Sequence, residues 1–214
     1  MKQFWLRFLK LNIGLVLFAL GIVLTLQANI GYSPWEIFHS GISRVTGISI
    51  GMVSIIVGVI IAVAAIIGGE KFGLGSILNM FIIGYLIDLL LDSNIIPVAD
   101  NLLYGTFLMV LGLYIIAVGS YFYIGAGFGA GPRDSLMISI NKKTNLPIGL
   151  VRGLIEASAA VVGWLLGGMV GIGTIIGAFG IGICVQTTFK LLRFDAAVVT
   201  HETLAETIAS FRNR

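Results

Sequence analysis

With 214 residues, the chain is long enough for one soluble domain or for a compact membrane bundle. Its composition excludes the soluble domain, because 57% of the residues are hydrophobic and only 11% are charged, whereas a typical soluble domain has about 25% charged residues. The net charge of +3 does not indicate nucleic-acid binding, since the basic residues flank apolar runs, where they set membrane orientation.

The first predicted element is a basic segment, Met1–Lys10, that runs into an apolar stretch. No small-residue A-x-A cleavage site closes this stretch, so we expect an uncleaved first span rather than a signal peptide. Six stretches have roughly the 20 apolar residues that a helix needs to cross a bilayer. The predicted spans are Leu9–Ala28, Ile48–Gly68, Phe72–Leu91, Leu102–Ile124, Leu146–Gly167 and Val170–Leu191.

Two shorter segments lie between the first and second spans and between the fourth and fifth. Ser33–Thr46 and Pro132–Thr144 are too short to cross, so each is expected to be interfacial or re-entrant. The remainder, Arg193–Arg214, predicts a short amphipathic helix at the membrane surface. We therefore expect an all-α membrane protein with a single transmembrane domain over residues 1–192 and a cytoplasmic tail over 193–214.

The positions of lysine and arginine predict the orientation, because cytoplasmic loops carry an excess of both. If the N-terminus is cytoplasmic, Arg44 is the one basic residue in an outer segment, and the outer loop Asp92–Asn101 has none. The sequence therefore predicts six spans in a bacterial inner membrane, with both termini in the cytoplasm.

An internal repeat covers most of the chain. Shifting the sequence by 98 positions aligns Gly14–Asp88 with Gly112–Gln186 without a gap, and roughly 21 of 75 positions are identical. The identical pairs include Gly31 and Gly129, Pro34 and Pro132, Thr46 and Thr144, Gly51 and Gly149, and Gly84 and Gly182. Each repeat, about residues 9–92 and 102–192, holds three spans and one short segment.

An odd number of spans in each repeat implies that the second copy enters the membrane upside down. The charge distribution independently places the first short segment outside and the second inside. Inverted repeats are the architecture of many secondary transporters, in which the substrate lies between the repeats near the midplane. The pattern favours transport, but as an analogy of architecture it names no substrate.

The two short segments share a G-x-x-P-x-[ED] string, with Trp35 in the first copy where the second has Arg133. One interpretation is structural: a capping residue and a proline begin a helix, and an acid completes a capping box. The residues that would do so are Ser33, Pro34 and Glu36 in the first copy and Gly131, Pro132 and Asp134 in the second.

The functional interpretation uses the same geometry. A glycine-rich run that enters a short helix is how transporters build broken helices near their substrate site. A helix start favours anions, but Glu36 and Asp134 already occupy these ends. A cation, a proton or a neutral polar molecule is therefore favoured over an anion, although Arg133 weakens this inference for the second copy.

The Gly-x-x-Pro-Trp-Glu string at Gly31–Glu36, its echo near Pro132 and the downstream Ile-Gly pair resemble the bacterial YczE/YitT-type integral membrane proteins. The resemblance extends over nearly the whole chain. It implies a membrane location and a six-span core, and it supplies no catalytic or substrate residues.

Ionisable groups within spans are costly and are candidates for function. Asp88 and its repeat partner Gln186 are either symmetry-related functional groups or, for Asp88, an interfacial carboxylate. Arg152 and Glu156 lie one helical turn apart and form either a self-neutralised pair or a gate in which Asp134 competes for Arg152.

Four further polar positions have simpler interpretations. Asn79, near the middle of the third span, is expected to hydrogen-bond to another helix. Gln27 and Asn29, at the end of the first span, either line an outer vestibule or merely solvate it. His39 has no partner at metal-ligand spacing and is expected to be an ordinary surface histidine.

No Walker motif, dinucleotide fingerprint or Cys/His cluster is present, so we expect no enzyme activity, no cofactor and no metal. The favoured function is a secondary transporter or permease for an unidentified small molecule or ion, with alternating access between the repeats. The alternative is a non-transporting membrane scaffold or accessory subunit. The expected partners are the lipid bilayer and the unidentified substrate, without nucleic acid, and the glycine-rich faces are compatible with a homodimer.

Overall fold

A computed structural model describes residues 2–212, with residues 2, 148, 197 and 210–212 described by their backbone alone. All regular elements in this range are helices. They are α1 (Lys2–Gln27), α2 (Pro34–Thr46), α3 (Ile50–Ile67), α4 (Leu74–Asp92), α5 (Leu102–Gly125), α6 (Pro132–Thr144), α7 (Ile148–Leu165), α8 (Ile172–Leu191), η1 (Ala196–Val198) and α9 (Leu204–Arg212).

Five helices of the described chain, α1, α3, α4, α5 and α8, are long and apolar enough to cross a membrane. They match five of the six predicted spans, so the prediction of a helical membrane protein is confirmed. α1 begins at Lys2, earlier than the predicted Leu9, because the basic flank continues the helix. α7 has 18 residues and occupies the place of the sixth predicted span. It is not among the five, so its crossing stays a prediction.

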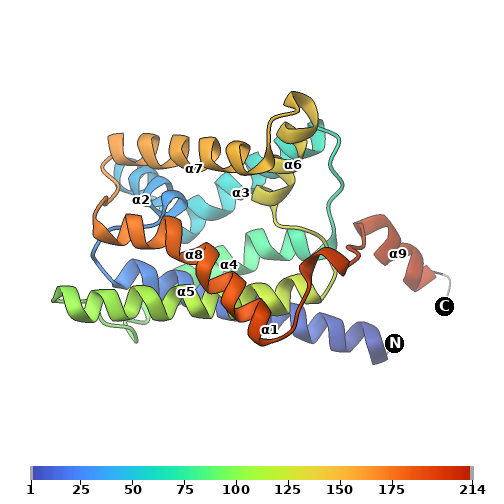
Figure 1. The fold of residues 1–214 in the computed structure, drawn as a ribbon, viewed down its shortest axis with the longest axis horizontal. Helices are drawn as coiled ribbons and strands as arrows, with labels where there is room; N and C mark the ends of the chain where they lie inside the picture. Colours follow the sequence, from blue (N-terminus) through green and yellow to red (C-terminus); the bar gives the residue numbers. More distant parts are fainter. Residues whose placement is uncertain (1, 213–214) are drawn as a thin grey trace.

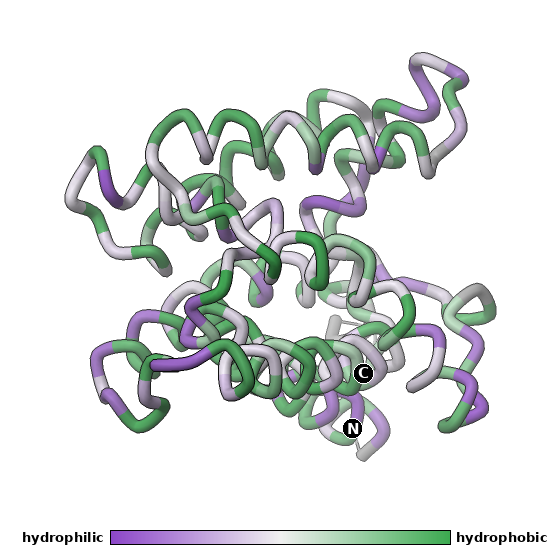
Figure 2. Tube along the Cα trace, turned by 60° about the vertical axis from the view of Figure 1, so that its left-hand side comes forward, coloured by the Kyte–Doolittle hydropathy of each residue, from purple (hydrophilic) through white to green (hydrophobic). Residues whose placement is uncertain are grey.

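The outer faces of these helices are apolar. Ile60 in α3 and Phe179 in α8 are 63% and 75% exposed, as expected for side chains that contact lipid. Figure 2 shows hydrophobic residues along the helices, with hydrophilic stretches mostly in the turns at their ends. The distribution is that of a bundle embedded in a membrane.

The centre of the bundle is the antiparallel pair α1 and α5, which lie together along one side in Figure 1. Two glycine pairs bring their backbones together, Gly14 with Gly119 and Gly21 with Gly112. A Cβ added to any of the four would lie 2.7–2.9 Å from the partner's carbonyl oxygen. Glycine is therefore required at both crossing points, as in other close-packed membrane helices.

α4 packs against α1, and α8 packs against α5. The backbone N–H of Gly75 in α4 donates to the carbonyl of Phe128 at 2.7 Å, and that of Gly173 in α8 donates to Ile30 at 2.8 Å. Each bond joins the start of a long helix to the loop that precedes a short one. The loops before α2 and α6 are thereby fixed to the central helices.

α2 packs against α7, and α3 packs against α6, so the short helices join the second layer of the bundle. α2 and α6 extend toward opposite ends of the molecule (Figure 1). At the end of α2, Arg44 donates to the carbonyl of Gly167 at 3.1 Å. At the end of α6, Lys142 pairs with Glu70 at 2.7 Å.

α3 and α4 pack closely, whereas α7 and α8 do not. Gly51 in α3 contacts the backbone carbonyl of Gly84 in α4, and no side chain would fit between them. Among the described residues, nothing lies within 4 Å of a Cβ added to Gly149 or Gly153 in α7, or to Gly182 in α8. The helices α3 and α4 are therefore in direct backbone contact at these glycines, whereas α7 and α8 are not.

The two ends of the chain meet. Arg7 in α1 forms an ion pair with Glu202 and donates from Nε to the carbonyl of Ala126 at 2.8 Å. The N–H of Leu204 donates to the carbonyl of Phe72 at 2.9 Å. The tail contains the short helix α9, as well as η1, and the segment between the two packs on the bundle; a position at the membrane surface stays a prediction. Arg214 lies outside the described residues.

Candidate functional site

Both short helices begin with a proline, as predicted. Pro34 opens α2 and Pro132 opens α6, and each fixes the first helical turn. Ser33 and Gly131 are the N-cap residues, as predicted, but the predicted capping boxes do not form: Ser33 makes no side-chain hydrogen bond to its helix, and glycine has no side chain to make one. The first turns of both helices therefore have no side-chain cap.

The starts of the two short helices meet. The guanidinium carbon of Arg133 lies 4.4 Å from the ring centroid of Trp35, a cation–π contact between α6 and α2. These two residues occupy the same position of the shared string. Since the far ends of α2 and α6 lie at opposite ends of the molecule (Figure 1), both helices run outward from a common interior point.

A polar cavity of ≈ 300 Å³ lies at this meeting point. It is lined by residues near the middle of several long helices, such as Gly58 in α3, Ile83 in α4 and Ile181 in α8. The polar side chains that line it are Trp35, His39, Ser54, Asn79, Ser120, Tyr123, Arg133, Asp134, Arg152 and Glu156. The structure therefore brings most of the predicted site residues together in one place.

The charges in this cavity are only partly paired. Arg152 donates to Glu156 at 2.8 Å, as the i, i+4 spacing predicted. Within the described residues, neither Arg133 nor Asp134 forms an ion pair within 4 Å or a side-chain hydrogen bond. Glu36 is 6% exposed beside the cavity and acts electrostatically on Arg133.

The C-terminal segment reaches the same region. Asp134 is acted on electrostatically by Arg152, Arg133, Glu156 and His201. His201 lies after the last long helix, where partial burial lowers its pKa and Asp134 opposes the effect. The cavity therefore faces the end of the molecule that holds the C-terminal segment.

The sequence prediction missed four polar residues of the cavity, namely His39, Ser54, Ser120 and Tyr123. His39 was expected at the surface, but it is 2% exposed and lines the cavity. Its Nε2 atom has no hydrogen-bond partner among the described residues. The expectation failed because α2 turns into the bundle; only the i, i+3 spacing from Glu36 could have hinted at a shared face.

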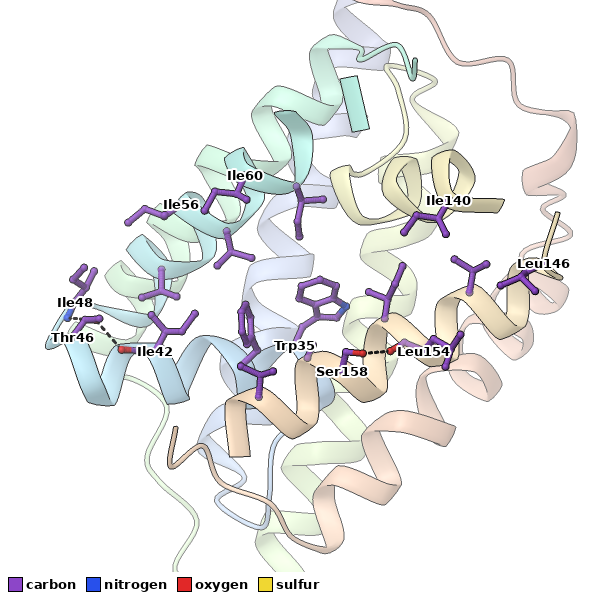
Figure 3. A pocket seen from close by; sticks show the side chains of 18 residues that line it. Trp35, Ile42, Thr46, Ile48, Ile56, Ile60, Ile140, Leu146, Leu154 and Ser158 are labelled. Carbon is purple, nitrogen blue, oxygen red and sulfur yellow. Dashed lines mark hydrogen bonds between the residues drawn. The ribbon is translucent and has the colours of Figure 1, made fainter. Parts of the chain in front are cut away.

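An apolar groove of ≈ 750 Å³ lies beside the polar cavity, between α3 and α7. Figure 3 shows Trp35 at its centre, with isoleucine and leucine side chains from both helices on either side. Trp35, Val57 and Ile155 line both the groove and the cavity. The indole therefore stands at the boundary between an apolar and a polar space.

Asp88 has a structural role at the end of α4. Its carboxylate accepts hydrogen bonds from Ser49 Oγ at 2.5 Å, the Gly51 N–H at 2.7 Å and the Met52 N–H at 3.1 Å. It thus caps the start of α3, which the sequence interpretation of a plain interfacial carboxylate did not foresee. Its repeat partner Gln186 is exposed and does not line the cavity.

The other predicted polar residues divide between cavity and loop. Asn79 lines the cavity and makes no side-chain hydrogen bond in the described chain, so the predicted helix–helix bond is wrong. Gln27 and Asn29 donate to the carbonyls of Ile96 and Ala99 at 2.9 and 3.4 Å, fixing the loop before α5. Among the described residues, no group of three or more His, Cys, Asp or Glu side chains is placed to hold a metal ion.

A helical bundle with five apolar helices of spanning length and a polar interior defines a multi-pass membrane protein. Residues 5–190 match a family of unknown function, DUF6198, and the chain belongs to this family. The sequence-based resemblance to YczE-type membrane proteins is confirmed.

Three curated relatives are similar over most of their length. The "Uncharacterized membrane protein YczE" of Bacillus subtilis (strain 168) is 34% identical over 190 residues, covering 86% of this chain and 87% of the relative. An "Uncharacterized protein" of Haemophilus influenzae is 32% identical, with 85% and 84% coverage. The "Uncharacterized protein YyaS" of B. subtilis is 30% identical, with 80% and 86% coverage. No solved structure matches the chain.

Proposed function

We propose that this protein is a secondary transporter for a small molecule, and that it works by alternating access between two inverted repeats of three spans each. The carrying observation is the polar cavity where α2 and α6 begin. It lies at the middle of the long helices and is lined from both halves of the chain. Binding sites at the meeting point of broken helices are typical of transporters.

Equivalent contacts in the two halves support the inverted repeat. The bond from Gly75 to Phe128 has a counterpart 98 positions away in the bond from Gly173 to Ile30. Gly14 meets Gly119, and the shift exchanges this pair for Gly112 and Gly21, which also meet. Contacts that exchange under the repeat are those expected of two copies related by a two-fold axis within the membrane plane.

The ends of the chain support an even number of spans. Arg7 precedes the apolar part of α1, and Glu202 follows α8, yet the two are paired. Both ends of the spanning region therefore lie on one side, which five crossings would not allow. A crossing α7 would supply the sixth span, and the distribution of lysine and arginine favours the cytoplasmic side of a bacterial inner membrane for both ends.

The unequal packing of the repeats supports alternating access. α3 and α4 are in backbone contact at Gly51 and Gly84, whereas their counterparts α7 and α8 make no such contact at Gly149 and Gly182 in the described chain. In two inverted copies, this difference closes one side of the membrane and opens the other. Exchanging the two arrangements would expose the cavity to the opposite side.

Within the site, we assign binding to Arg133 and Asp134, because they line the cavity and neither forms an ion pair within 4 Å or a side-chain hydrogen bond in the described chain. Trp35 holds the guanidinium of Arg133 in place, and the Arg152–Glu156 pair holds Arg152. Pro34 and Pro132 end the irregular segments that let the two helices start inside the bundle. The proposal assigns no catalytic step to the chain and needs no cofactor.

Thiol accessibility tests alternating access without knowledge of the substrate. In a Cys184→Ala background, Ser120→Cys places one thiol in the cavity. A membrane-impermeant maleimide applied to oriented vesicles should label it from the cytoplasmic side and, more slowly, from the other side. Labelling confined to one side under every gradient would contradict transport and favour the scaffold or accessory subunit.

Uptake tests the binding residues once a solute is found. Solutes that raise the thermal unfolding midpoint of the purified protein would be assayed in proteoliposomes. Asp134→Asn and Glu36→Gln should lose uptake while remaining folded, whereas Glu70→Gln, whose pair with Lys142 lies at the other end of α6 from the cavity, should retain it. Normal uptake by both cavity variants would show that the site is elsewhere.

A further inference from the structure

The polar cavity and the apolar groove have a common boundary. Trp35, Val57 and Ile155 contribute to both, and neighbouring turns of α3 and α7 continue from one space into the other. The Arg133 guanidinium covers one region of the Trp35 ring. A ligand that occupied both spaces would therefore pass the indole.

The lining of the groove is almost entirely apolar. The hydroxyls that line it belong to Thr46 and Ser158, and they donate within their own helices, to Ile42 at 2.8 Å and Leu154 at 2.7 Å (Figure 3). The other side chains that line it are apolar, apart from the indole N–H of Trp35. Only an apolar chain or ring would gain from binding here.

The groove is open at its rim. Ile56 and Ile60 on α3 are 42% and 63% exposed, and Leu154 on α7 is 54% exposed. α3 and α7 are spaced apart on either side, as Figure 3 shows. If α7 crosses the membrane as proposed above, the opening between it and the spanning helix α3 faces the lipid. A hydrophobic chain could enter it sideways.

Two adjacent residues of opposite charge, Arg133 and Asp134, line the cavity. Arg133 contacts the Trp35 ring, but in the described chain neither residue has an ion-pair partner within 4 Å or a side-chain hydrogen bond. Asp134 is exposed and Arg133 is half-buried, so a ligand can reach both, and a purely anionic or purely cationic head would pair with only one of them. A head with both an ammonium and an anionic group satisfies both.

His39 adds a second, independent indication of a polar ligand. Its Nε2 is buried without a hydrogen-bond partner and lies on the cavity wall. Buried polar atoms without a protein partner are rare in native structures, and a water molecule or a ligand commonly provides the missing hydrogen bond. A head group in the cavity would provide that partner.

We propose that the substrate is an amphipathic zwitterion, with an ammonium and a phosphate or carboxylate in the polar cavity and an apolar chain in the groove beside Trp35. The inference rests on the proposed transport function and specifies the class of its substrate. Arg133 would bind the anionic oxygens, and Asp134 would bind the ammonium. The volume of ≈ 300 Å³ accommodates a small head group, and the longer groove accommodates the chain.

Fluorescence of Trp35 tests this directly. Trp5→Phe and Trp164→Phe leave Trp35 as the one tryptophan of the chain. The probe is lysophosphatidylethanolamine with a brominated acyl chain, which quenches an indole on contact, titrated into the purified full-length protein in detergent. Quenching should saturate, and Arg133→Gln and Asp134→Asn should each raise the apparent Kd about tenfold or more, a loss of about 1.4 kcal/mol.

Three comparisons make the result specific. Glu70→Gln should bind as well as the parent protein, because Glu70 pairs with Lys142 far from the cavity. Ser158→Phe should fill the groove and weaken binding of the lipid probe. Free phosphoethanolamine, whose binding is measured by its stabilisation of the protein, should bind this variant as well as it binds the parent protein. Brominated lysophosphatidylglycerol, whose head is anionic only, should bind at least tenfold more weakly.

Equal quenching by both lipids, unaffected by the cavity variants, would overturn the proposal and show that any membrane lipid fills the groove. An absence of quenching would also overturn it. The titration uses no gradient, so its failure is distinct from a failure of transport. If the probe binds but no flux is found, the ligand class stands and the transporter does not.

Discussion

At the residue scale, Asp88 is the clearest case of a side chain whose role follows from its geometry. It accepts three hydrogen bonds at the start of α3, and a carboxylate at a helix N-terminus is favoured by the unpaired N–H groups and the helix dipole. Asp88→Ala should therefore lower the free energy of unfolding by about 1–3 kcal/mol. Equilibrium unfolding in detergent would measure it.

Gln186→Ala is the matched control for Asp88→Ala, since Gln186 holds the equivalent place in α8 and its side chain makes no hydrogen bond in the described chain. It should change the free energy of unfolding by less than about 0.5 kcal/mol. Equal losses in the two variants would mean that Asp88 stabilises the protein through something other than the cap.

Some site residues could be predicted from the sequence and others could not. The Arg152–Glu156 pair follows from a local rule, because i, i+4 side chains share a helix face whatever the helix packs against. The Arg133–Trp35 contact joins residues far apart in the chain and depends on how α2 and α6 dock. His39 was misjudged for the same reason, since the burial of a short helix cannot be read from its own composition.

At the scale of helices, the glycine contacts between α1 and α5 predict that these positions tolerate no larger side chain. Gly112→Leu would drive a side chain into the Gly21 carbonyl, which lies 2.7 Å from the Cβ position. Overpacking of this kind costs about 1–3 kcal/mol or more. We expect loss of the folded peak in size-exclusion chromatography, or a clearly lower thermal unfolding midpoint.

Gly153→Ala controls for the effect of replacing a helix glycine where no neighbouring helix among the described residues is in contact. Gly153 lies within α7, and nothing in the described chain lies within 4 Å of its added Cβ. Alanine favours helix over glycine by about 1 kcal/mol in a helix interior, so this variant should be as stable as the parent or more stable. A loss comparable with that of Gly112→Leu would argue against the packing of α1 and α5 as the cause.

The separation of α7 and α8 leads to a prediction about movement. If alternating access brings these helices together as α3 and α4 are now, Gly149 must approach Gly182 as Gly51 approaches Gly84. Gly149→Leu should leave the present state intact and prevent that approach. Uptake should fall at least tenfold, and the cavity thiol at position 120 should be labelled from the cytoplasmic side only.

Gly153→Ile controls for added bulk on α7, because its repeat counterpart is Ile55, which already packs against Gly84. Isoleucine at this position should therefore be accepted in both arrangements, and uptake should continue. Equal loss of uptake in the two variants would indicate that α7 tolerates no bulk, rather than that Gly149 is a closing point.

The limits of the short helices could be predicted closely, but their course could not. Proline at the first turn and a residue with positive φ at the end, Gly47 at 74° and Asn145 at 55°, define α2 and α6 in the sequence itself. Whether such a helix lies on the surface or enters the bundle depends on what covers its backbone and side chains. That information is in the contacts of α2 with α7 and of α3 with α6.

At the scale of the whole molecule, composition and hydropathy sufficed for the class of protein. Helices must satisfy their own backbone hydrogen bonds in lipid, so long apolar runs have few alternatives. The arrangement of these helices is a different matter. The repeat, at roughly 21 of 75 identities, suggested how the halves correspond, but the closed and separated helix pairs break that correspondence and could not be foreseen from it.

The course of α7 decides the topology of the whole molecule. α7 follows α6, whose end is fixed by Lys142 to Glu70 in the loop between α3 and α4. That loop also holds the C-terminal segment, through the bond from Leu204 to Phe72. The end of α7 lies instead beside Arg44 at the end of α2. These contacts place the two ends of α7 at opposite ends of the bundle, as a crossing helix requires.

Reporter fusions test this topology. Green fluorescent protein at the C-terminus should fluoresce, because that end is expected in the cytoplasm, and alkaline phosphatase inserted between residues 166 and 171 should be active outside. An inactive phosphatase at that loop would place both ends of α7 on the cytoplasmic side. The repeats would then have unequal numbers of spans, they could not be inverted copies, and the cavity would lose the symmetry on which alternating access depends.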